Sequence, residues 1–395
     1  MADALLNEAG EMAEQIRTWR RELHAHPELS GRERETARYV AGELRSMGIE
    51  SVEEFGGGFG VVADVGPATG PRVALRADLD ALPIQEETGA EYASTVPGVM
   101  HACGHDAHVA MLLAAARLLQ NRLESLTRPV RLIFQPHEEV YPGGAAGMIE
   151  AGVLEGVGSI FGLHVCTNLK VGELGTRPGP FMAAVNPFKI VVAGKGGHAA
   201  MPDECVDPVV VAAEIVLALQ TIVSRTIPIS EPALVSVTRL EAGTADNVTP
   251  EAVEMIGTIR SFDESVRTHV CRRVREISAG VAHAHRATAD TQIESGYPVL
   301  VNDSVVTARA LDAARRVGFD ERRLQTLVPQ GGGEDFAYYC REVPGAFAFL
   351  GVANPEKGLF FPHHHPRFDI DEAALPFGAA LLARFAIDEP ASGKS

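Results

Sequence analysis

The stretch MHACGHDAHVAMLLAAARLLQNRLESLTRPVRLIFQPHEE, residues 100–139, carries the signals that decide the fold. Alanine and leucine fill Ala107–Asn121 with the composition of a helix, and the short apolar run Val130–Phe134 follows it. Two more apolar runs of strand length, Gly60–Val65 and Arg72–Arg76, precede this stretch. Strands that alternate with helices in this way predict an α/β sheet.

Helical periodicity continues on both sides of these strands. Apolar residues recur at helical spacing in Ala13–Leu23 and in Glu33–Met47, and Gly48 supplies a stop for the second helix. Further along, the pattern predicts a helix, a strand and a final helix at Ser304–Val317, Ala346–Gly351 and Asp371–Ala386. We therefore expect an α/β domain with a mixed central sheet flanked by helices.

A second pattern interrupts the first near Pro187. It predicts a strand, a helix, two strands, a helix and a strand at Phe188–Ala193, Pro208–Ser224, Ala233–Leu240, Ala252–Arg260, Glu264–His283 and Ala287–Glu294. This βαββαβ order is typical of a two-layer unit that can stand as an insertion. Because 395 residues are too many for one ordinary core, we expect a discontinuous domain of residues 1–182 and 295–395 around an inserted domain of residues 183–294.

Composition restricts the class of partner. Lys and Arg total 35 against 52 for Asp and Glu, and the net charge of -17 argues against binding to nucleic acid or to anionic membranes. The N-terminus lacks a signal pattern and no uncharged apolar run reaches about 18 residues, so we expect a cytoplasmic protein without a membrane span. Five single cysteines without a CxxC pair make a disulfide framework an unfavourable interpretation.

The first chemical cluster lies just before the helix of the opening stretch. One thiol, three imidazoles and a carboxylate fall within His101–His108, a density that is costly unless it is used. Cys103 and His105 stand two apart, so in an extended loop both side chains can reach one metal, with Asp106 and Ala107 starting the helix. The alternative is a buried thiol beside an ordinary helix histidine, and His108 is better interpreted as a residue that packs behind a ligand than as a ligand.

The second cluster is the acidic pair Glu138 and Glu139, in the segment Gln135–Glu139 that directly follows the apolar strand Val130–Phe134. Side chains of adjacent residues in an extended segment diverge, so one carboxylate can bind a metal while its neighbour stays free as a general base. A solvated acidic loop is the alternative. Strand ends are where α/β enzymes build their sites, which favours the chemical interpretation.

Three further groups can complete a metal site. His164 lies inside an apolar strand, where a satisfied core histidine is the alternative, and one ligand is expected from the three imidazoles of Pro362–Pro366. Asp78 and Asp80 share one face at a strand end and can hold a ligand or complete the metal shell. Sulfur, nitrogen and oxygen donors together suit Zn²⁺, Mn²⁺, Co²⁺ or Ni²⁺ rather than Mg²⁺ or Ca²⁺, and five ligands are enough to suggest two metals.

At this point the sequence resembles the dinuclear metal amidohydrolases, which include bacterial N-acyl-amino-acid amidohydrolases, hippurate hydrolases and plant indole-acetyl-amino-acid hydrolases. The resemblance covers nearly the whole chain. It rests on eight motifs in order: RRELHAHPELS (20–30), LRADLDALPI (75–84), MHACGHDAH (100–108), IFQPHEE (133–139), GLHV (162–165), GKGGHAAMP (194–202), GGEDFAYY (332–339) and HHPRFDIDEAALPFGAAL (364–381).

The resemblance implies roles for individual residues. Its metal ligands correspond to Cys103, His105, Glu139, His164 and His364, the last chosen because it stands two residues before Pro366. The catalytic base corresponds to Glu138. The resemblance implies two divalent transition metal ions, Mn, Zn, Co or Ni, in a catalytic domain of residues 1–182 and 295–395.

The inserted domain of such relatives serves as a lid and a dimer surface. The resemblance therefore implies a homodimer or a dimer-based oligomer, in which His198 reaches the active site of the partner subunit, and it nominates Asn247 and Arg260 as substrate contacts. Arg260 also has a physical argument of its own, because a guanidinium is the natural clamp for the free carboxylate of an acyl-amino acid. A surface salt bridge is the alternative for Arg260.

Together with these residues, the resemblance implies metal-dependent hydrolysis of N-acyl amino acids, of the acetyl, benzoyl or aryl-acetyl type, to a carboxylic acid and a free amino acid. Glu138 is expected to take a proton from water and to return it to the leaving amine, while His198 helps to stabilise the oxyanion. A dipeptidase or aminopeptidase would differ only in its pocket. Two different classes of protein also stay open, a metal-free hydrolase with Cys103 as nucleophile and a binding protein without catalytic activity.

Overall fold

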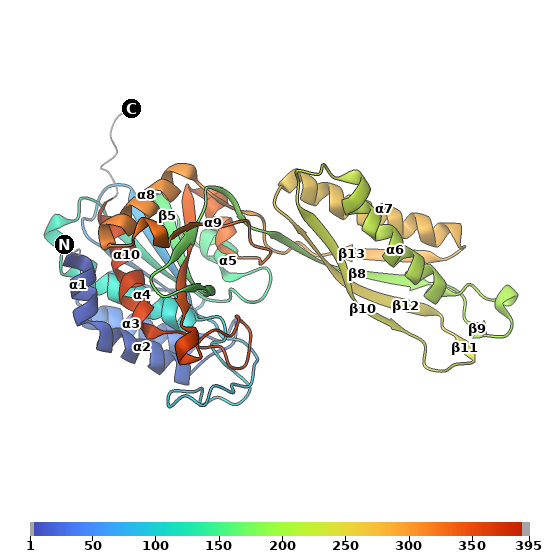
Figure 1. Cartoon of the computed structure of the whole chain (residues 1–395), viewed down its shortest axis with the longest axis horizontal. Coiled ribbons are helices and arrows are strands. Elements are labelled where there is room, and N and C mark those ends of the chain that lie inside the picture. The colour runs from blue at the N-terminus through green and yellow to red at the C-terminus, as the bar shows by residue number, and fades with distance from the viewer. Residues whose placement is uncertain (1–3, 389–395) are drawn as a thin grey trace. The chain divides into compact units, whose positions relative to one another are not determined.

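The computed structural model describes residues 4–388, which fold into two compact units (Figure 1). Within the described residues, one unit extends to Phe181 and also contains Val301–Val328 and residues 335–388, while the other consists of Met182–Leu300 and Pro329–Glu334. Packing alone defines these units. The division into a catalytic domain and an inserted lid domain at residues 183 and 294 therefore stays a prediction.

An eight-stranded sheet forms the centre of the first unit, in the order β1-β2-β4-β3-β5-β16-β6-β15. Its strands are β1 (Val52–Phe55), β2 (Gly60–Val65), β3 (Arg72–Asp78), β4 (Val130–Gln135), β5 (Val157–Lys170), β6 (Leu174–Thr176), β15 (Leu324–Thr326) and β16 (Gly345–Ala353). The central strands β4, β3, β5 and β16 run parallel, whereas β1 with β2, β2 with β4 and β6 with β16 pair antiparallel. The expected mixed sheet is confirmed.

Helices cover both faces of this sheet. They are α1 (Ala4–Glu11), α2 (Ala13–Ala25), α3 (Arg34–Ser46), α4 (His105–Gln120), α5 (Gly144–Glu150), α8 (Ser304–Val317), α9 (Phe336–Glu342) and α10 (Leu375–Ile387). Successive residues of a strand point to opposite faces, and in β5 Phe161 stacks on Phe385 of α10 while Gly162 faces Phe336 of α9. Such two-sided cover explains why all of β16 and all but the first residue of β3 are buried.

Helix α4 is the central helix of this unit. It packs against β3, β5 and α10, and every residue except Arg117 and Gln120 is buried, as expected of a helix that is apolar on all sides. The sequence predicted its start at Asp106, but the helix begins at His105. This first residue therefore faces the C-terminal edge of the sheet from a rigid helix terminus.

The second unit is a four-stranded antiparallel sheet in the order β10-β12-β8-β13, packed against two helices. Its main elements are β8 (Ala184–Ala193), α6 (Pro208–Thr226), β10 (Ala233–Ala242), β12 (Ala252–Ser261), α7 (Glu264–Ala284) and β13 (Thr288–Ile293). They confirm the predicted βαββαβ order. Two strands of two residues, β9 (Gly197–His198) and β11 (Val248–Thr249), form an extra ribbon that the sequence did not predict. The shorter β7 (Gly179–Met182) and β14 (Leu300–Asn302) pair with each other.

Helix α6 is the one helix within residues 4–388 that is long and apolar enough to cross a membrane. One side of it, with Val211, Ile215 and Leu219, is buried against the sheet of the second unit. The other side leaves Val210 and Leu217 exposed. A core helix passes the same test of length and composition, so the absence of a membrane partner stays a prediction.

Candidate metal centre

The candidate side chains gather where the parallel strands of the large sheet end. Asp78, the last residue of β3, pairs with Gln135, the last residue of β4, and the predicted acidic pair follows Gln135 after two residues. Because Arg76 of β3 pairs with Gly162 of β5, His164 lies level with Asp78 in the neighbouring strand. The C-terminal edge of parallel strands is the usual place for a site in such sheets.

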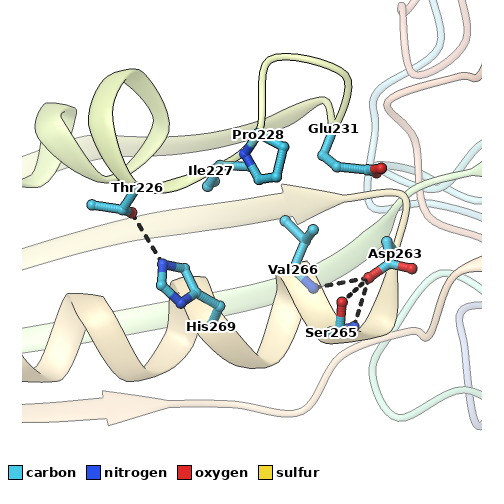
Figure 2. A pocket seen from close by; sticks show the side chains of 8 residues that line it. All are labelled: Thr226, Ile227, Pro228, Glu231, Asp263, Ser265, Val266 and His269. Atoms are coloured by element: carbon cyan, nitrogen blue, oxygen red, sulfur yellow. Dashed lines mark hydrogen bonds between the residues drawn. The ribbon is translucent and has the colours of Figure 1, made fainter.

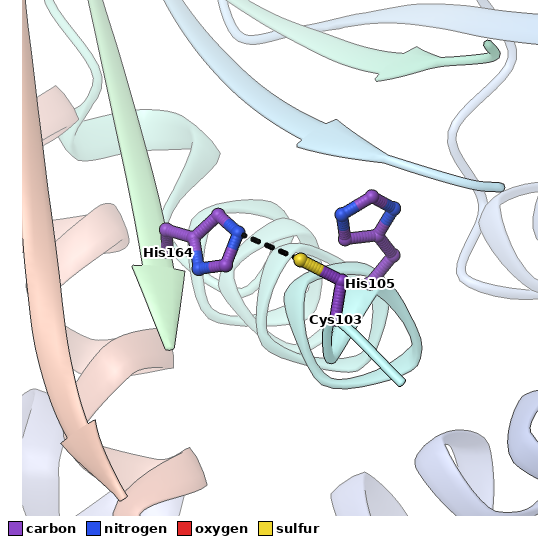
Figure 3. A group of neighbouring side chains, drawn as sticks. All are labelled: Cys103, His105 and His164. Carbon is purple, nitrogen blue, oxygen red and sulfur yellow. Dashed lines mark hydrogen bonds between the residues drawn. The ribbon is translucent and has the colours of Figure 1, made fainter. Parts of the chain in front are cut away.

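Cys103 and His105 approach this edge through a turn rather than through the extended loop that the sequence predicted. Gly104 between them has φ of +87°, and a β-carbon there would lie 2.4 Å from Val165 Cγ2, so only glycine fits. The turn brings the thiol of Cys103 and the imidazole of His105 to the same side of the start of α4 (Figure 3). The expectation that both side chains point the same way was right, but its geometric reason was wrong.

His164 presents one defined nitrogen to the thiol. Its Nδ1–H donates to the carbonyl oxygen of Val165 at 2.7 Å, which leaves the lone pair of Nε2 directed at Cys103 Sγ, 3.5 Å away (Figure 3). Burial lowers the pKa of His164 well below its ordinary value. The imidazole is therefore neutral at Nε2, which is the form that binds metal ions.

His105 is oriented in the same way by a carboxylate. Its Nδ1 lies 3.2 Å from Asp80 Oδ1, and its Nε2 lies 3.8 Å from Glu139 Oε1. Burial lowers the pKa of His105, but Asp78, Asp80 and Glu139 outweigh it and raise the value to about 10. The pocket thus carries surplus negative charge, which a cation would neutralise.

Of the three imidazoles in the C-terminal run, His364 turns toward the cluster. Its Nε2 lies 3.3 Å from Glu139 Oε1, and its backbone has φ of +64°. His363 Nε2 instead donates to a main-chain carbonyl at 3.0 Å, and His365 Nδ1 accepts a main-chain N–H at 3.0 Å while its ring stacks on Phe361. The structure therefore brings the predicted residue of this run, and neither neighbour, to Glu139.

These side chains fit divalent transition metals. Three overlapping sets bring their ligand atoms within 4.8 Å of one another: Cys103, His105 and His164; Cys103, Glu139 and His364; His105, Glu138 and Glu139. The buried atom His105 Nε2 has no hydrogen-bond partner in the described part of the chain. Converging sulfur, nitrogen and oxygen donors with unsatisfied lone pairs are typical of a site for borderline metal ions, and the overlap suits two cations that share ligands.

Glu138 lies beside these ligands but differs from its neighbour. Its side chain is 7% exposed, and of these three sets it belongs to the one that contains His105 and Glu139. Glu139, by contrast, also reaches Cys103 and His364. The two adjacent carboxylates therefore have different surroundings, as their divergent directions in the chain require.

His108 is fully engaged in hydrogen bonds of the protein. Its Nδ1 donates to Asp78 Oδ1 at 2.5 Å, and its Nε2 accepts the main-chain N–H of Val165 at 2.9 Å. Since both ring nitrogens are used, His108 supports the segment that carries His164 instead of offering a ligand atom. This geometry favours the packing interpretation over a ligand role.

A buried hydrogen-bond network next to the acidic loop was not predicted from the sequence. Arg76 donates to Asp78, to Gln135 at 2.9 Å and to Asp335 at 2.8 Å, with all four side chains inaccessible to water or nearly so. Burial raises the pKa of Asp335 to about 6 although the charge of Arg76 lowers it. The available signal was a single arginine inside the apolar run Arg72–Asp78, where an unpaired charge would be costly.

The predicted substrate residues belong to the second unit. His198 in β9 pairs with Val248, and the carbonyl oxygen of Asn247 accepts the N–H of Ala199 at 3.1 Å, so His198 and Asn247 are neighbours. Arg260 lies near the far end of β12, where its Nε donates to a main-chain carbonyl at 3.0 Å. From the first residue of β12 to Arg260 the strand extends about 26 Å, so the ribbon and Arg260 lie at opposite ends of it.

A separate cavity of about 340 Å³ lies in the second unit between the end of α6 and the start of α7 (Figure 2). Of its two acidic residues, Glu231 and Asp263, the second accepts the main-chain N–H groups of Ser265 and Val266, and the imidazole of His269 contacts the hydroxyl of Thr226. The carboxylate of Asp263 is thus occupied as a helix cap. The cavity brings together no set of metal-ligating side chains within the described residues.

Comparison with known proteins agrees with this geometry. Residues 74–388 match the model of peptidase family M20/M25/M40. The chain is 42% identical to N-acetylcysteine deacetylase of Bacillus subtilis over 93% of this chain and 95% of that protein. It is 41% identical to thermostable carboxypeptidase 1 of Saccharolobus solfataricus over 98% of both chains.

A solved structure supports the same assignment. The dinuclear metal-binding peptidase of the M20 family from Bacillus subtilis superposes with a TM-score of 0.84 at 38% identity, covering 96% of this chain and 98% of that one. The family resemblance found in the motifs is thereby confirmed, and the relatives are hydrolases by name. The chain is a hydrolase and belongs to peptidase family M20/M25/M40.

Proposed function

We propose that this protein is a metal-dependent amidohydrolase that cleaves N-acyl amino acids into a carboxylic acid and a free amino acid. The observation that carries the proposal is that Cys103, His105, Glu139, His164 and His364 converge in overlapping sets of ligand atoms, with Glu138 in one of these sets. The similarity to a deacetylase of an N-acetylated amino acid supports the substrate class. An acetyl, benzoyl or aryl-acetyl group is the expected acyl part.

The five ligand residues would hold two divalent cations, Zn, Mn, Co or Ni. When bound, such cations supply Lewis acidity that acidifies water and polarises the amide carbonyl. The residues of the chain prepare the ligand atoms: Asp80 orients His105, and the carbonyl of Val165 orients His164. These outer contacts fix the ring tautomers that expose Nε2.

Glu138 is the proposed proton carrier. Its carboxylate takes one proton from the attacking water and delivers that proton to the amide nitrogen as the C–N bond breaks. The balance is one water consumed per amide, with the hydroxyl retained by the acyl carbon and the second hydrogen by the amine. Low exposure of Glu138 keeps the proton from exchanging freely with bulk water.

Arg260, Asn247 and His198 are the proposed substrate residues of the second unit. Arg260 would clamp the free carboxylate of the amino acid, while Asn247 and His198 would contact the acyl-amide group and stabilise its oxyanion. The separation of about 26 Å along β12 makes it difficult for Arg260 and His198 of one subunit to meet on one small substrate. This supports the proposal that the protein is a homodimer whose His198 serves the partner's site.

The experiment combines metal analysis with a substrate panel. We expect purified protein to contain divalent transition metal, to lose hydrolysis of N-acetyl, N-benzoyl or indole-acetyl amino acids on chelation, and to regain it on metal add-back. Glu138→Ala should lose at least about 100-fold in kcat with its metal content unchanged, because general base catalysis contributes about that factor. Glu150→Ala, an exposed glutamate of α5, is the control and should keep full activity. Turnover retained by Glu138→Ala would contradict the role of this residue.

A peptidase activity is the second candidate, because the chain is equally similar to a carboxypeptidase. Kinetics on N-acyl amino acids and on unblocked dipeptides in parallel distinguish the two, since the better substrate has the higher kcat/KM. A thiol hydrolase is disfavoured because burial and the neighbouring carboxylates raise the pKa of Cys103 well above its ordinary value. A nucleophilic thiol needs surroundings that lower the pKa, and a thiol enzyme would be insensitive to chelation.

A further inference from the structure

Glu33 is a buried carboxylate for which the proposed reaction has no use. Its side chain is 0% exposed, and although it stands at the N-cap of α3 it makes no capping hydrogen bond there. Instead its Oε1 accepts the N–H of Gly31 at 2.9 Å and the N–H of His137 at 2.7 Å. The side chain therefore connects the segment before α3 with the loop that carries Glu138.

The peptide that Glu33 holds is in a demanding conformation. His137 has φ of +62°, a left-handed backbone that costs a residue with a side chain about 1 kcal/mol or more. The carbonyl oxygen of His137 accepts the N–H of Gly144 at 2.8 Å. A β-carbon at Gly144 would lie 1.9 Å from the carbonyl oxygen of Pro136, so this loop closes only around a glycine. The N–H and the carbonyl oxygen of His137 are thus both held by hydrogen bonds, to Glu33 and to Gly144.

A matching contact fixes the loop on the other side of Glu138. The N–H of Glu139 donates to Asp80 Oδ2 at 2.9 Å, and the hydroxyl of Ser30 donates to the same oxygen at 2.6 Å. Ser30 and Glu33 come from one short segment. Glu138 therefore lies between two main-chain N–H groups, each of which is held by a buried carboxylate.

We propose that Glu33 is a positioning residue that aims the carboxylate of Glu138 by holding the preceding peptide in its left-handed conformation. The inference rests on the proposed role of Glu138 as proton carrier. The hydrogen bonds of Glu33 to Gly31 and His137 both go to main-chain N–H groups, so Glu33 acts on the backbone of the loop. The proposal also explains the role of His137 in this loop, because its main-chain N–H, and not its ring, takes part in the contact with Glu33.

Three substitutions of Glu33 in the metal-loaded, full-length enzyme test the proposal. Glu33→Ala removes the acceptor, and Glu33→Asp shortens its reach by one methylene, so both should lower kcat about 10- to 100-fold with KM and metal content nearly unchanged. Glu33→Gln keeps an oxygen that accepts both N–H groups and should retain kcat within about threefold. If the alanine variant does not fold, the aspartate and glutamine pair still decides the question. Wild-type kcat in Glu33→Asp overturns the proposal.

Glu28→Ala is the matched control. Glu28 lies in the same segment and accepts the N–H of Thr36 at 2.8 Å and its hydroxyl at 2.9 Å, so it anchors α3 without a contact to the acidic loop. We expect Glu28→Ala to lower stability but to leave kcat within about threefold. An equal loss of kcat in both alanine variants would show a general structural effect and contradict positioning.

Hydrogen exchange gives a result that is independent of turnover. Amides of residues 135–140 should exchange faster in Glu33→Ala and Glu33→Asp than in the wild type, and at the wild-type rate in Glu28→Ala and Glu33→Gln. Exchange at the wild-type rate in Glu33→Asp overturns the positioning role even if the kcat of this variant is lowered. If the wild type hydrolyses neither acyl-amino acids nor peptides, the proposed function fails, while the exchange measurement still decides whether Glu33 holds the loop.

Discussion

Glu33 is expected to make stability depend on pH. Burial raises its pKa to about 7, and the charge of Asp80 acts in the same direction, against an ordinary value of 4.5. The folded state therefore binds this proton more tightly than the unfolded state. Its contribution to the free energy of unfolding is fully present below about pH 4.5 and falls by about 3 kcal/mol as the pH rises to about 7 and beyond.

Glu33→Gln isolates this contribution, because a neutral amide does not titrate. The free energy of unfolding of Glu33→Gln minus that of the wild type should increase between pH 5 and pH 7.5. Urea unfolding of both proteins at these two pH values measures the difference. The groups that face Glu33 are Asp80 and the main-chain N–H groups of Gly31 and His137, all unchanged by the substitution. A difference that is the same at both pH values would contradict the assignment.

At the scale of residues, the sequence predicted candidate site residues best where several metal-ligating side chains lie close together in the chain. Cys103, His105 and the acidic pair are dense motifs at predicted strand and helix ends, and the structure brings them together with His164 and His364. Glu33 could not be predicted in this way, because it lies in the charged segment GRERET, which is typical of a solvated surface. Its partner His137 is 104 residues away, and only the fold creates that contact.

At the scale of elements, the packing of α10 on α4 sets the position of the helix that begins with His105. Gly378 of α10 permits this packing, because a β-carbon there would lie 2.0 Å from Met111 Sδ and 3.0 Å from Leu350 Cδ2. We expect Gly378→Ala to lower the free energy of unfolding by about 1 to 3 kcal/mol through overpacking. Chemical denaturation measures the change.

The same substitution elsewhere is the control. Gly280 lies within α7, and a β-carbon there would have nothing within 4 Å. Gly280→Ala should therefore raise the free energy of unfolding by up to about 1 kcal/mol, because alanine loses less backbone entropy in a helix. Equal effects of the two substitutions would show that helix propensity, not the contact with α4, decides both.

The spacing of apolar residues was sufficient to predict most helices and strands, since the mixed sheet and the βαββαβ order follow from runs of apolar residues. This spacing did not predict features that depend on single residues or on very short strands. The start of α4 was placed one residue late because the left-handed turn at Gly104 has no periodic signal. The strands β9 and β11 are two residues long, shorter than any alternation that the sequence could display.

At the scale of the whole molecule, the net charge of -17 and the mixed donor set point to a small substrate rather than to a polyanionic partner. The apolar surface of α6 points to one macromolecular partner. Val210 is 55% and Leu217 is 72% exposed, and they stand seven residues apart on one side of the helix. An exposed apolar stripe of this kind is typical of an interface.

We expect a second copy of the chain to cover this stripe. The double substitution Val210→Glu and Leu217→Glu should convert a dimer into a monomer in analytical ultracentrifugation, because burying two carboxylates in an apolar interface is costly. Since His198 is proposed to serve the partner's site, the monomer should also lose most of its kcat while it keeps its metal. Ile229→Glu, at a fully exposed position of the same unit, is the control and should stay dimeric and active. A monomer with full turnover would contradict the proposal that His198 serves the partner's site, whereas a dimer that persists would contradict the interface on α6.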